Sequence, residues 1–334
     1  MNIAIVKLSA LGDIVHAMVA LQFIKQALPY ARIDWLVERS FAGVLADNPH
    51  IDRVLTVDLK ALKTDKSRIL AEIRKVRAYA AASYDRVIDA QGLIKSALVA
   101  RLLSPHCSGF DHRSIREKLA SLCYETTVAY PYDANTIDRN IAVLTQPFGI
   151  SVSREQMLNK QPFLYFQPPA ADLDACFARD KPNVMLVIGS TWPSRNYPLP
   201  HVLEVVQSLN AQSLIVWGNE QERSHAEWLS ERSSANVLPK LTLNDLKAAI
   251  ARCDLLIGND TGPTHMAWGL NRPSITLFGP TPVSRVYQTD INKVLKSPSV
   301  VNPYQLDRND FSIAEIPPRQ VVTLAESLLG TRPS

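Results

Sequence analysis

Short apolar runs alternate with helical patterns through the first half of the chain. Continuous apolar runs predict buried strands at residues 3–6, 33–37, 54–57 and 86–90. Apolar residues at helical spacing predict helices over 13–28, 41–46, 68–79 and 94–103. This alternation is typical of a parallel sheet that is covered by helices on both faces.

The second half repeats the alternation. Strands are predicted at 184–188, 214–217, 254–257 and 275–278, and helices over 201–209, 220–232, 243–251, 264–270 and 319–329. The segment 158–170 contains Pro162, Pro168 and Pro169 and has little periodicity, so we place a linker there. A chain of 334 residues suits two cores. We therefore predict domains over 1–160 and 161–316, followed by a C-terminal segment, 317–334.

Composition and charge exclude several classes of protein. The chain is 46% hydrophobic and 20% charged, which is ordinary for a globular protein. It has no apolar run near the ~18–20 residues that span a bilayer, and no basic segment of a signal peptide, so we expect a cytoplasmic location. Its net charge of +4 is too small to indicate nucleic acid. Four scattered cysteines are typical of free thiols.

Basic residues concentrate in one short stretch. Residues 60–77 hold seven Lys or Arg against Asp65 and Glu72. Such a run is compatible with a solvated helix face, with a site for an anionic substrate or with an acidic membrane surface.

Residues 257–265, with the sequence IGNDTGPTH, form the most informative motif. A buried strand precedes it and a helix follows it, so backbone N–H groups, a hydroxyl and His265 gather at a helix N-terminus. That arrangement suits a phosphate or diphosphate. The alternative is that Asp260 and Thr261 only cap the helix.

Asp13 follows the first predicted strand and a Ser-Ala-Leu-Gly turn. At the start of a helix it is either a cap or an ionised carboxylate that is available as a general base. Neither a G-x-G-x-x-G dinucleotide fingerprint nor a Walker lysine motif is present. The one Asp-x-Asp pair, Asp172 and Asp174, lies in a polar helix-like stretch after the linker, so we interpret it as surface rather than as a metal site.

Four motifs in order resemble one family. Residues 6–16, 87–97, 257–265 and 277–281, with the spacing between them, resemble the ADP-heptose:lipopolysaccharide heptosyltransferases, glycosyltransferase family 9. The resemblance extends from residue 1 to about 285. It implies an α/β GT-B fold, in which two Rossmann-like domains with parallel sheets face a central cleft. In that fold the last helix, within 317–334, packs back on the N-terminal domain.

The resemblance also implies the reaction. It is an inverting, metal-independent transfer of L-glycero-D-manno-heptose from ADP-heptose to Kdo of Kdo-lipid A, without a cofactor. The enzyme would lie on the cytoplasmic face of the inner membrane as a peripheral protein. The segment 89–96 favours transfer to Kdo over transfer to an existing heptose, which is the first alternative. A non-catalytic two-domain binding protein for small molecules is the second.

Matched positions imply the site residues. The general base would be Asp13. The donor site would comprise Thr191, Arg195, Glu222, Asp260, Thr261, Gly262 and His265, with Arg195 standing where the family has Lys and residues 238–242 lining the adenine. The acceptor site would comprise Lys60, Lys63, Lys66, Gln91, Gly92 and Arg116. Asn135 replaces a family His, and the lysines replace a cluster that is richer in Arg.

Overall fold

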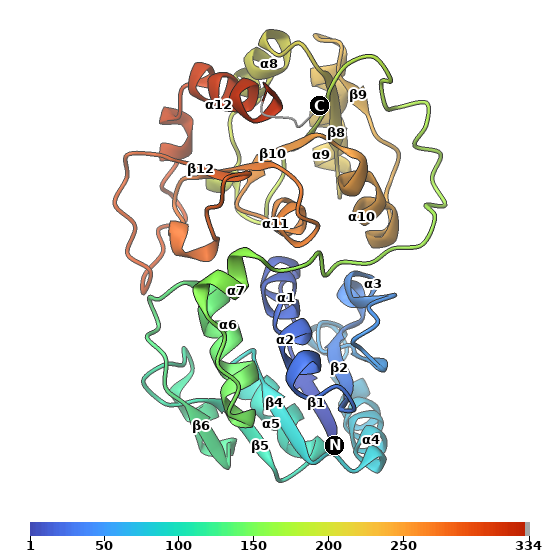
Figure 1. The fold of residues 1–334 in the computed structure, drawn as a ribbon, viewed down its shortest axis with the longest axis vertical. Coiled ribbons are helices and arrows are strands. Elements are labelled where there is room, and N and C mark those ends of the chain that lie inside the picture. Colours follow the sequence, from blue (N-terminus) through green and yellow to red (C-terminus); the bar gives the residue numbers. More distant parts are fainter. Residues whose placement is uncertain (331–334) are drawn as a thin grey trace. The chain divides into compact units, whose positions relative to one another are not determined.

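The protein is known here from a computed structural model that describes residues 1–330, with only the backbone of Lys63. The chain divides into two units, Met1–Tyr165 and Phe166–Ser334, at a point inside the predicted linker (Figure 1). Among the described residues, no helix is both long enough and apolar enough to cross a membrane.

The first unit is built on a parallel sheet with the order β3-β2-β1-β4-β5-β6. Its strands are β1 (Asn2–Val6), β2 (Arg32–Glu38), β3 (Arg53–Val57), β4 (Arg86–Asp89), β5 (Cys107–Phe110) and β6 (Thr126–Val128). Ile3 of β1 is paired with Ile33 on one side and Arg86 on the other. Residues 3–6 are fully buried, which explains why this strand reads as a continuous apolar run.

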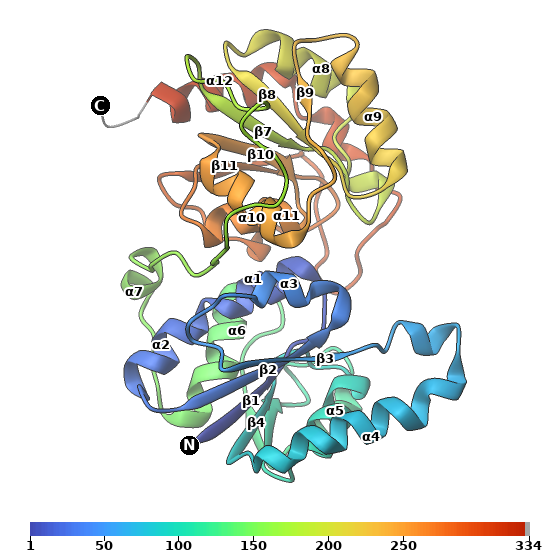
Figure 2. The ribbon, with the colours of Figure 1, turned by 90° about the vertical axis from the view of Figure 1, so that its right-hand side faces the viewer.

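Helices cover both faces of this sheet. On one face α6 (Thr136–Thr145) packs against α1 (Leu11–Met18) and α2 (Ala20–Ala27), and on the other α4 (Ile69–Tyr79) packs against α5 (Ile94–Leu103) (Figure 2). The other helical segments are α3 (Ala42–Leu45), α7 (Arg154–Leu158) and the short 3₁₀ turns η1 (Arg39–Phe41), η2 (Ala61–Lys63), η3 (Lys66–Arg68), η4 (Ala80–Ala82), η5 (Lys118–Cys123) and η6 (Gln146–Phe148).

The second unit repeats this topology. Its parallel sheet has the order β12-β11-β10-β7-β8-β9, so both sheets have the doubly wound order 3-2-1-4-5-6 in chain sequence. Its strands are β7 (Asn183–Val187), β8 (Gln212–Val216), β9 (Asn236–Val237), β10 (Leu255–Asn259), β11 (Ser274–Phe278) and β12 (Asn292–Lys296). Its helical segments are α8 (Leu199–Ser208), α9 (Glu220–Ser230), α10 (Leu243–Arg252), α11 (Gly262–Gly269), α12 (Pro318–Gly330), η7 (Pro193–Arg195), η8 (Val283–Arg285) and η9 (Ser312–Glu315).

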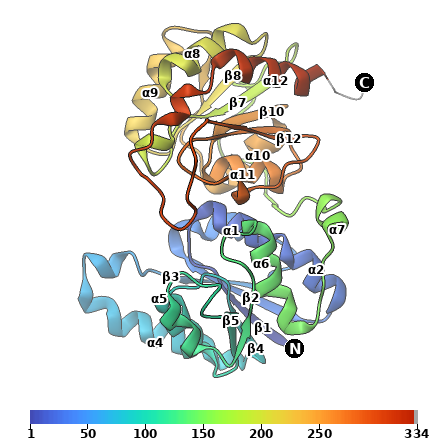
Figure 3. The ribbon, with the colours of Figure 1, turned by 90° about the vertical axis from the view of Figure 1, so that its left-hand side faces the viewer.

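The C-terminal helix α12 packs against α8, β10 and β11 within the second unit (Figure 3). Val321, Ala325 and Leu328, at helical spacing, belong to the buried core of that unit. The apolar stripe of α12 is thus buried beside α8 within its own unit, and the predicted return of this segment to the N-terminal domain stays a prediction. Residues 331–334 of the predicted segment lie outside the described residues.

The predicted elements are largely confirmed. All eight predicted strands are present, and they belong to two parallel six-stranded sheets. The predicted helix 13–28 is interrupted at Val19, which keeps right-handed helical angles between α1 and α2. The stretch around Asp172 forms turns rather than the expected helix, and Asp174 pairs with Arg252 at 2.8 Å.

Candidate functional site

Each sheet has a topological switch point, where neighbouring strands are followed by loops that run to opposite faces. In the first unit this point lies between β1 and β4, and in the second between β7 and β10. Ligands of open α/β sheets bind outside the carboxyl ends of the strands at such points. Asp13 and Gln91 follow β1 and β4, whereas Arg195 and Asp260 follow β7 and β10. The structure therefore brings the residues predicted from separate motifs to two strand edges.

Asp89 organises the strand edge of the first unit. It is fully buried and its carboxylate accepts hydrogen bonds from the Tyr124 hydroxyl at 2.7 Å and the Ser96 hydroxyl at 2.8 Å. It also accepts from the backbone N–H groups of Gln91 and Gly92, at 2.8 and 3.2 Å. Burial raises the pKa of Asp89, and the four hydrogen bonds oppose that rise. The carboxylate thus fixes the turn after β4.

Gln91 and Gly92 have structural roles in this turn. The side-chain oxygen of Gln91 accepts from the backbone N–H groups of Leu8 and Ser9, at 3.1 and 3.0 Å. Gly92 has φ +72°, and a Cβ there would lie 3.1 Å from Ile115, so a larger residue is strained. The side-chain oxygen of Gln91 therefore holds the loop that leads to Asp13. Any contact of its side-chain NH₂ group with a ligand would be in addition to this role.

Lys7 and Asn140 complete this support, and the sequence analysis did not single them out. The Lys7 ammonium is buried and donates to the Ala90 carbonyl at 2.7 Å and to the Asn140 side-chain oxygen at 3.2 Å. A lysine that directly follows a buried strand was the available signal. It ties the loop after β1 to the turn after β4.

Asp13 lies in the first turn of α1 and is half-buried. Its carboxylate accepts from the backbone N–H of Ala10 at 3.4 Å, which is a long hydrogen bond. The geometry is therefore that of a weak cap in a half-buried position, and the base and cap interpretations of the sequence are both compatible with it.

The predicted acceptor residues lie along the carboxyl edge of the first sheet, in two groups. Lys60 follows β3 in the chain. Its ammonium lies 3.3 Å from the Ser40 hydroxyl and 4.3 Å from the centre of the Phe41 ring. Lys66 is exposed at the start of η3, and the Lys63 side chain lies outside the described part of the chain. Arg116 is exposed after β5, next to Ile115.

Arg139 braces the segment near Arg116. Its guanidinium donates to the carbonyls of Ser114, Tyr130 and Pro131, at 2.6, 3.1 and 2.5 Å. Asn135, which replaces the family His, accepts from the backbone N–H of Ile137 at 2.8 Å and caps α6. The local role of Asn135 is therefore a helix cap.

Asp260 is the centre of the second strand edge. It is almost fully buried and is surrounded by three cationic or ionisable groups. One carboxylate oxygen lies 2.9 Å from His265 Nε2, and the other lies 3.4 Å from both Arg195 Nη2 and Arg285 Nε. Burial alone would raise the pKa of Asp260, but Arg285, His265 and Arg195 together hold it well below its usual range. The carboxylate is therefore ionised and orients the three groups.

This cluster carries excess positive charge. Two guanidiniums surround a single carboxylate, and both retain partial exposure, Arg195 at 14% and Arg285 at 29% of the side chain. The three partners come from η7, α11 and η8, which follow β7, β10 and β11 respectively. A partly open site with this charge suits an anion that has two or more negative groups.

Arg285 was not predicted from the sequence. It follows residues 277–281, which the sequence analysis did use, but no motif marks it. The available signal was a basic residue close behind a strand-end turn. Thr281, in that same turn, is buried, and its hydroxyl has no hydrogen-bond partner among the described residues. The Ser194 hydroxyl, next to Arg195, shares both properties.

Thr261 and Gly262 form the entry to α11. Thr261 is extended at the N-cap, and its side chain makes no capping hydrogen bond, so the predicted cap is absent. The helix begins at Gly262 with Pro263 in the first turn, as the sequence indicated. A Cβ on Gly258 would lie 2.5 Å from the Thr264 hydroxyl, so this strand glycine lets α11 approach the sheet closely.

Glu222 folds back over the ends of β7 and β8. Its two carboxylate oxygens accept from the Gly218 N–H at 2.6 Å and from the Asn219 amide at 2.8 Å. A Cβ on Gly189 would lie 2.2 Å from the Glu222 carboxyl, so the Glu222 side chain could not keep its place if residue 189 carried a side chain. Thr191, in the same loop as Arg195, is exposed and is not part of the Asp260 cluster.

The predicted adenine segment lies beside this carboxylate. The Trp217 indole donates to the Leu238 carbonyl at 2.7 Å, and Lys240 donates to the Gly218 carbonyl at 2.9 Å. These bonds join residues 238–240 to the loop that holds Glu222. The donor residues predicted from separate motifs therefore line one edge of the second sheet.

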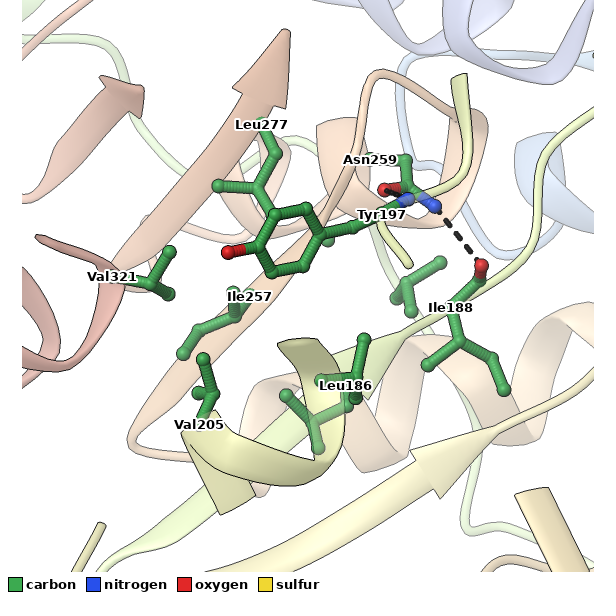
Figure 4. A pocket seen from close by; sticks show the side chains of 11 residues that line it. Leu186, Ile188, Tyr197, Val205, Ile257, Asn259, Leu277 and Val321 are labelled. Atoms are coloured by element: carbon green, nitrogen blue, oxygen red, sulfur yellow. Dashed lines mark hydrogen bonds between the residues drawn. The ribbon is translucent and has the colours of Figure 1, made fainter. Parts of the chain in front are cut away.

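A mostly aliphatic cavity lies beneath this edge (Figure 4), and hydrogen bonds at its rim hold the loop after β7 in place. At its rim Asn259 donates to the Ile188 carbonyl at 3.0 Å and accepts from the Tyr197 N–H at 3.0 Å. The Tyr197 hydroxyl donates to the Ile316 carbonyl at 2.6 Å. We interpret this cavity as part of the core that positions residues 188–197.

Comparison with known proteins gives consistent matches. The family model described as glycosyltransferase family 9 (heptosyltransferase) matches residues 72–298. The chain is 33% identical to lipopolysaccharide heptosyltransferase 1 of Campylobacter coli, over 99% of both chains. It is 32% identical to the protein of that name from Escherichia coli K12, over 84% of this chain and 88% of the relative.

A solved structure of a heptosyltransferase is also similar to this chain. The E. coli heptosyltransferase WaaC with ADP-2-deoxy-2-fluoro heptose is 26% identical, has a TM-score of 0.79 and is covered over 99% of its length by 98% of this chain.

Proposed function

This chain belongs to glycosyltransferase family 9, the heptosyltransferases, and we propose that it moves L-glycero-D-manno-heptose from ADP-heptose onto Kdo of a Kdo-lipid A acceptor. Heptose transfer in lipopolysaccharide synthesis follows from its relatives. We propose the Kdo acceptor, the inverting course and the residue roles on the grounds that follow.

The second unit binds the donor in this proposal. Arg195, His265 and Arg285 contact the diphosphate, whose charge they match, while Asp260 orients them. The N–H groups at the start of α11, beside Thr261 and Gly262, add further donors. When the sugar leaves, the same groups stabilise the departing ADP without a metal.

Glu222 receives the ribose hydroxyls. Its carboxylate lies at the ends of β7 and β8, and the adjoining segment 238–240 supplies backbone groups to the adenine. Thr191 reaches the phosphates from the exposed side of its loop.

Asp13 is the general base. An inverting transfer needs a carboxylate that takes the acceptor hydroxyl proton while the oxygen attacks the anomeric carbon opposite the leaving diphosphate. Asp13 is half-buried in the first turn of α1, where the helix dipole favours a negative charge.

Lys60, Lys63, Lys66 and Arg116 bind the anionic acceptor. They follow β3 and β5 at the carboxyl edge of the first sheet, and Gln91 and Gly92 lie between these groups in the strand order. We expect Lys60→Gln, Lys63→Gln and Lys66→Gln together to raise the acceptor KM about tenfold and to leave the donor KM unchanged.

The salt dependence of this triple variant is a further check. Because exposed charges are screened within about 10 Å at 0.1 M salt, the acceptor KM of the wild type should rise with salt more than that of the variant. Arg223→Gln with Arg232→Gln, two exposed arginines of the second unit, is the control. Equal acceptor KM values in variant and wild type would remove the lysines from the acceptor site.

One observation carries the proposal: two strand edges of identical topology present a half-buried carboxylate in one unit and a cationic cluster in the other. Its test is to incubate the protein with ADP-heptose and Kdo-lipid A in EDTA and to detect the product by mass. Proton NMR of the product then gives the anomeric configuration, and retention of the donor configuration would contradict an inverting course.

The same assay separates the alternatives. A heptosyl-Kdo acceptor tests transfer to heptose, and preference for it over Kdo-lipid A would select that reaction. ADP-heptose binding without turnover on either acceptor would indicate a binding protein. Because lipid A is embedded in a bilayer, we also propose that the enzyme acts as a peripheral protein at the inner membrane.

A further inference from the structure

The first unit exposes large apolar side chains mainly on three adjoining elements. Leu70 of α4 is 66% exposed, Ile94 and Leu98 of α5 are 41% and 54% exposed, and Leu119 and Leu122 of η5 are 67% and 80% exposed. The helix α5 packs against both α4 and η5. We name this face the α4–α5–η5 surface.

Basic side chains accompany these apolar ones. Arg74 and Arg77 lie four and seven residues after Leu70, so they continue its stripe along α4. On α5 and η5 the exposed basic residues are Lys95, Arg101 and Lys118. Among the described residues, Arg74, Arg77, Lys95 and Lys118 form no ion pair.

Acidic groups on the surface are already engaged. The only acid within these three elements is Glu72, whose carboxylate accepts from the Asp58 N–H at 3.1 Å and lies 3.9 Å from Lys75. Glu117, just before η5, accepts from the Ile94 N–H at 2.7 Å. The face therefore combines exposed leucines with unneutralised positive charge.

The surface adjoins the proposed acceptor site. Ile94 and Lys95 begin α5 directly after the Gln91-Gly92 turn, and Leu119 follows Arg116 by three residues. The amino end of α4 likewise follows β3 and the Lys60–Lys66 segment. These apolar side chains consequently stand at the same sheet edge as the residues that would receive Kdo.

We propose that the α4–α5–η5 surface docks on an anionic phospholipid bilayer, its leucines entering the headgroup region and its Lys and Arg side chains pairing with lipid phosphates. This inference rests on the proposed function, because it gives the surface through which the enzyme reaches a lipid-anchored acceptor. Apolar insertion together with basic residues is the combination that holds peripheral proteins at anionic membranes. A purely apolar protein interface would not require the surrounding positive charge.

The test measures sedimentation of the full chain with vesicles of phosphatidylethanolamine and phosphatidylglycerol. We expect Leu119→Ser with Leu122→Ser, and separately Lys95→Gln with Lys118→Gln, to weaken binding at least tenfold. Val300→Ser with Tyr304→Ser, two exposed apolar residues of the second unit, should bind like the wild type. Pure phosphatidylcholine vesicles should bind the wild type weakly.

Kinetics with two acceptors complete the test. The leucine variant should lose activity on Kdo-lipid A in vesicles and keep activity within about twofold on a deacylated, soluble Kdo acceptor. Unchanged vesicle binding by both variants overturns the proposal, and so does equal loss on both acceptors, which would assign the surface to the acceptor site itself. Asp13→Asn should still bind vesicles, so a failure of the proposed chemistry is seen separately.

Discussion

Asp89 and Asp260 lie at corresponding places in two sheets of the same strand order, at the carboxyl end of the fourth strand of each unit. Both carboxylates are buried, but Asp89 is held by hydroxyl and amide donors alone, whereas Asp260 is held by two guanidiniums and an imidazole. The pKa of Asp89 is raised by its burial, and that of Asp260 is lowered because its cations outweigh burial. One topology thus supports a carboxyl group that neutral donors hold, which fixes a turn, and a carboxylate that cations surround, which forms an anion site.

The comparison predicts that chemistry depends on the first unit and donor charge on the second. Asp13→Asn should lower kcat by ~10²–10⁴-fold, the usual contribution of a positioned general base. The amide keeps the capping oxygen, so the melting temperature should change little. Glu220→Gln, an acid in the first turn of α9, is the matched control. Turnover near that of the wild type would leave Asp13 as a cap only.

Stability should respond more strongly to the charged carboxylate. Asp260→Asn removes a buried negative charge that faces both Arg195 and Arg285, and we expect the free energy of unfolding to fall by about 3 kcal/mol. Asp89→Asn keeps one accepting oxygen and should lower it by about 1–2 kcal/mol. Denaturant titration of each variant measures both values, and equal losses would remove the distinction between the two sites.

Donor affinity sharpens the assignment of the cationic cluster. Arg285→Ala and Arg195→Ala should each weaken ADP binding about tenfold, because each removes a charge-assisted contact with the diphosphate. Calorimetry with ADP measures this, and Arg232→Ala, an exposed arginine just after α9, should bind normally. If Arg285→Ala leaves the affinity unchanged, Arg285 serves only to balance Asp260.

The smallest expected effect is a difference between Asp260 and Asp89 in how each makes the free energy of unfolding depend on pH. The folded pKa of Asp260 lies below its unfolded value, so its stabilisation is present above about pH 4 and is lost as the pH falls further. The pKa of Asp89 in the folded state is raised above its unfolded value. Its contribution to the free energy of unfolding is therefore greatest at low pH and is lost as the pH rises through the folded-state pKa. Comparing each Asn variant with the wild type between pH 3 and 7 should give slopes of opposite sign.

The sequence predicted central elements better than marginal ones. Every strand next to a switch point was found, because such strands are buried on both faces and read as apolar runs. The missed strands β6 and β9 are short, polar edge strands, and β12 is an edge strand with two lysines. The missed strand β5 is buried, but its Cys, Ser and Gly do not form an apolar run. The helix α6 was also missed, although Asn135 caps it.

Site residues were predictable where a motif marked them. Asp260 and His265 lie in one short turn, so their proximity follows from local sequence. Arg285 reaches the same carboxylate from a different loop, and only the folded sheet brings it there. The contact of Gln91 with the acceptor stays a prediction. No motif indicated that its side-chain oxygen also accepts from the backbone of a distant loop, because that pairing depends on β1 lying beside β4.

The repeated strand order gives the protein two separately supported sets of loops. Arg195, Asp260 and Arg285 rest on the core of the second unit, whereas Asp13 and Gln91 rest on that of the first. The packing beneath each set of loops belongs to its own unit. We expect laboratory chimaeras that join the two halves of different relatives near residue 165 to keep both cores, so that the two sets of loops can be exchanged one at a time.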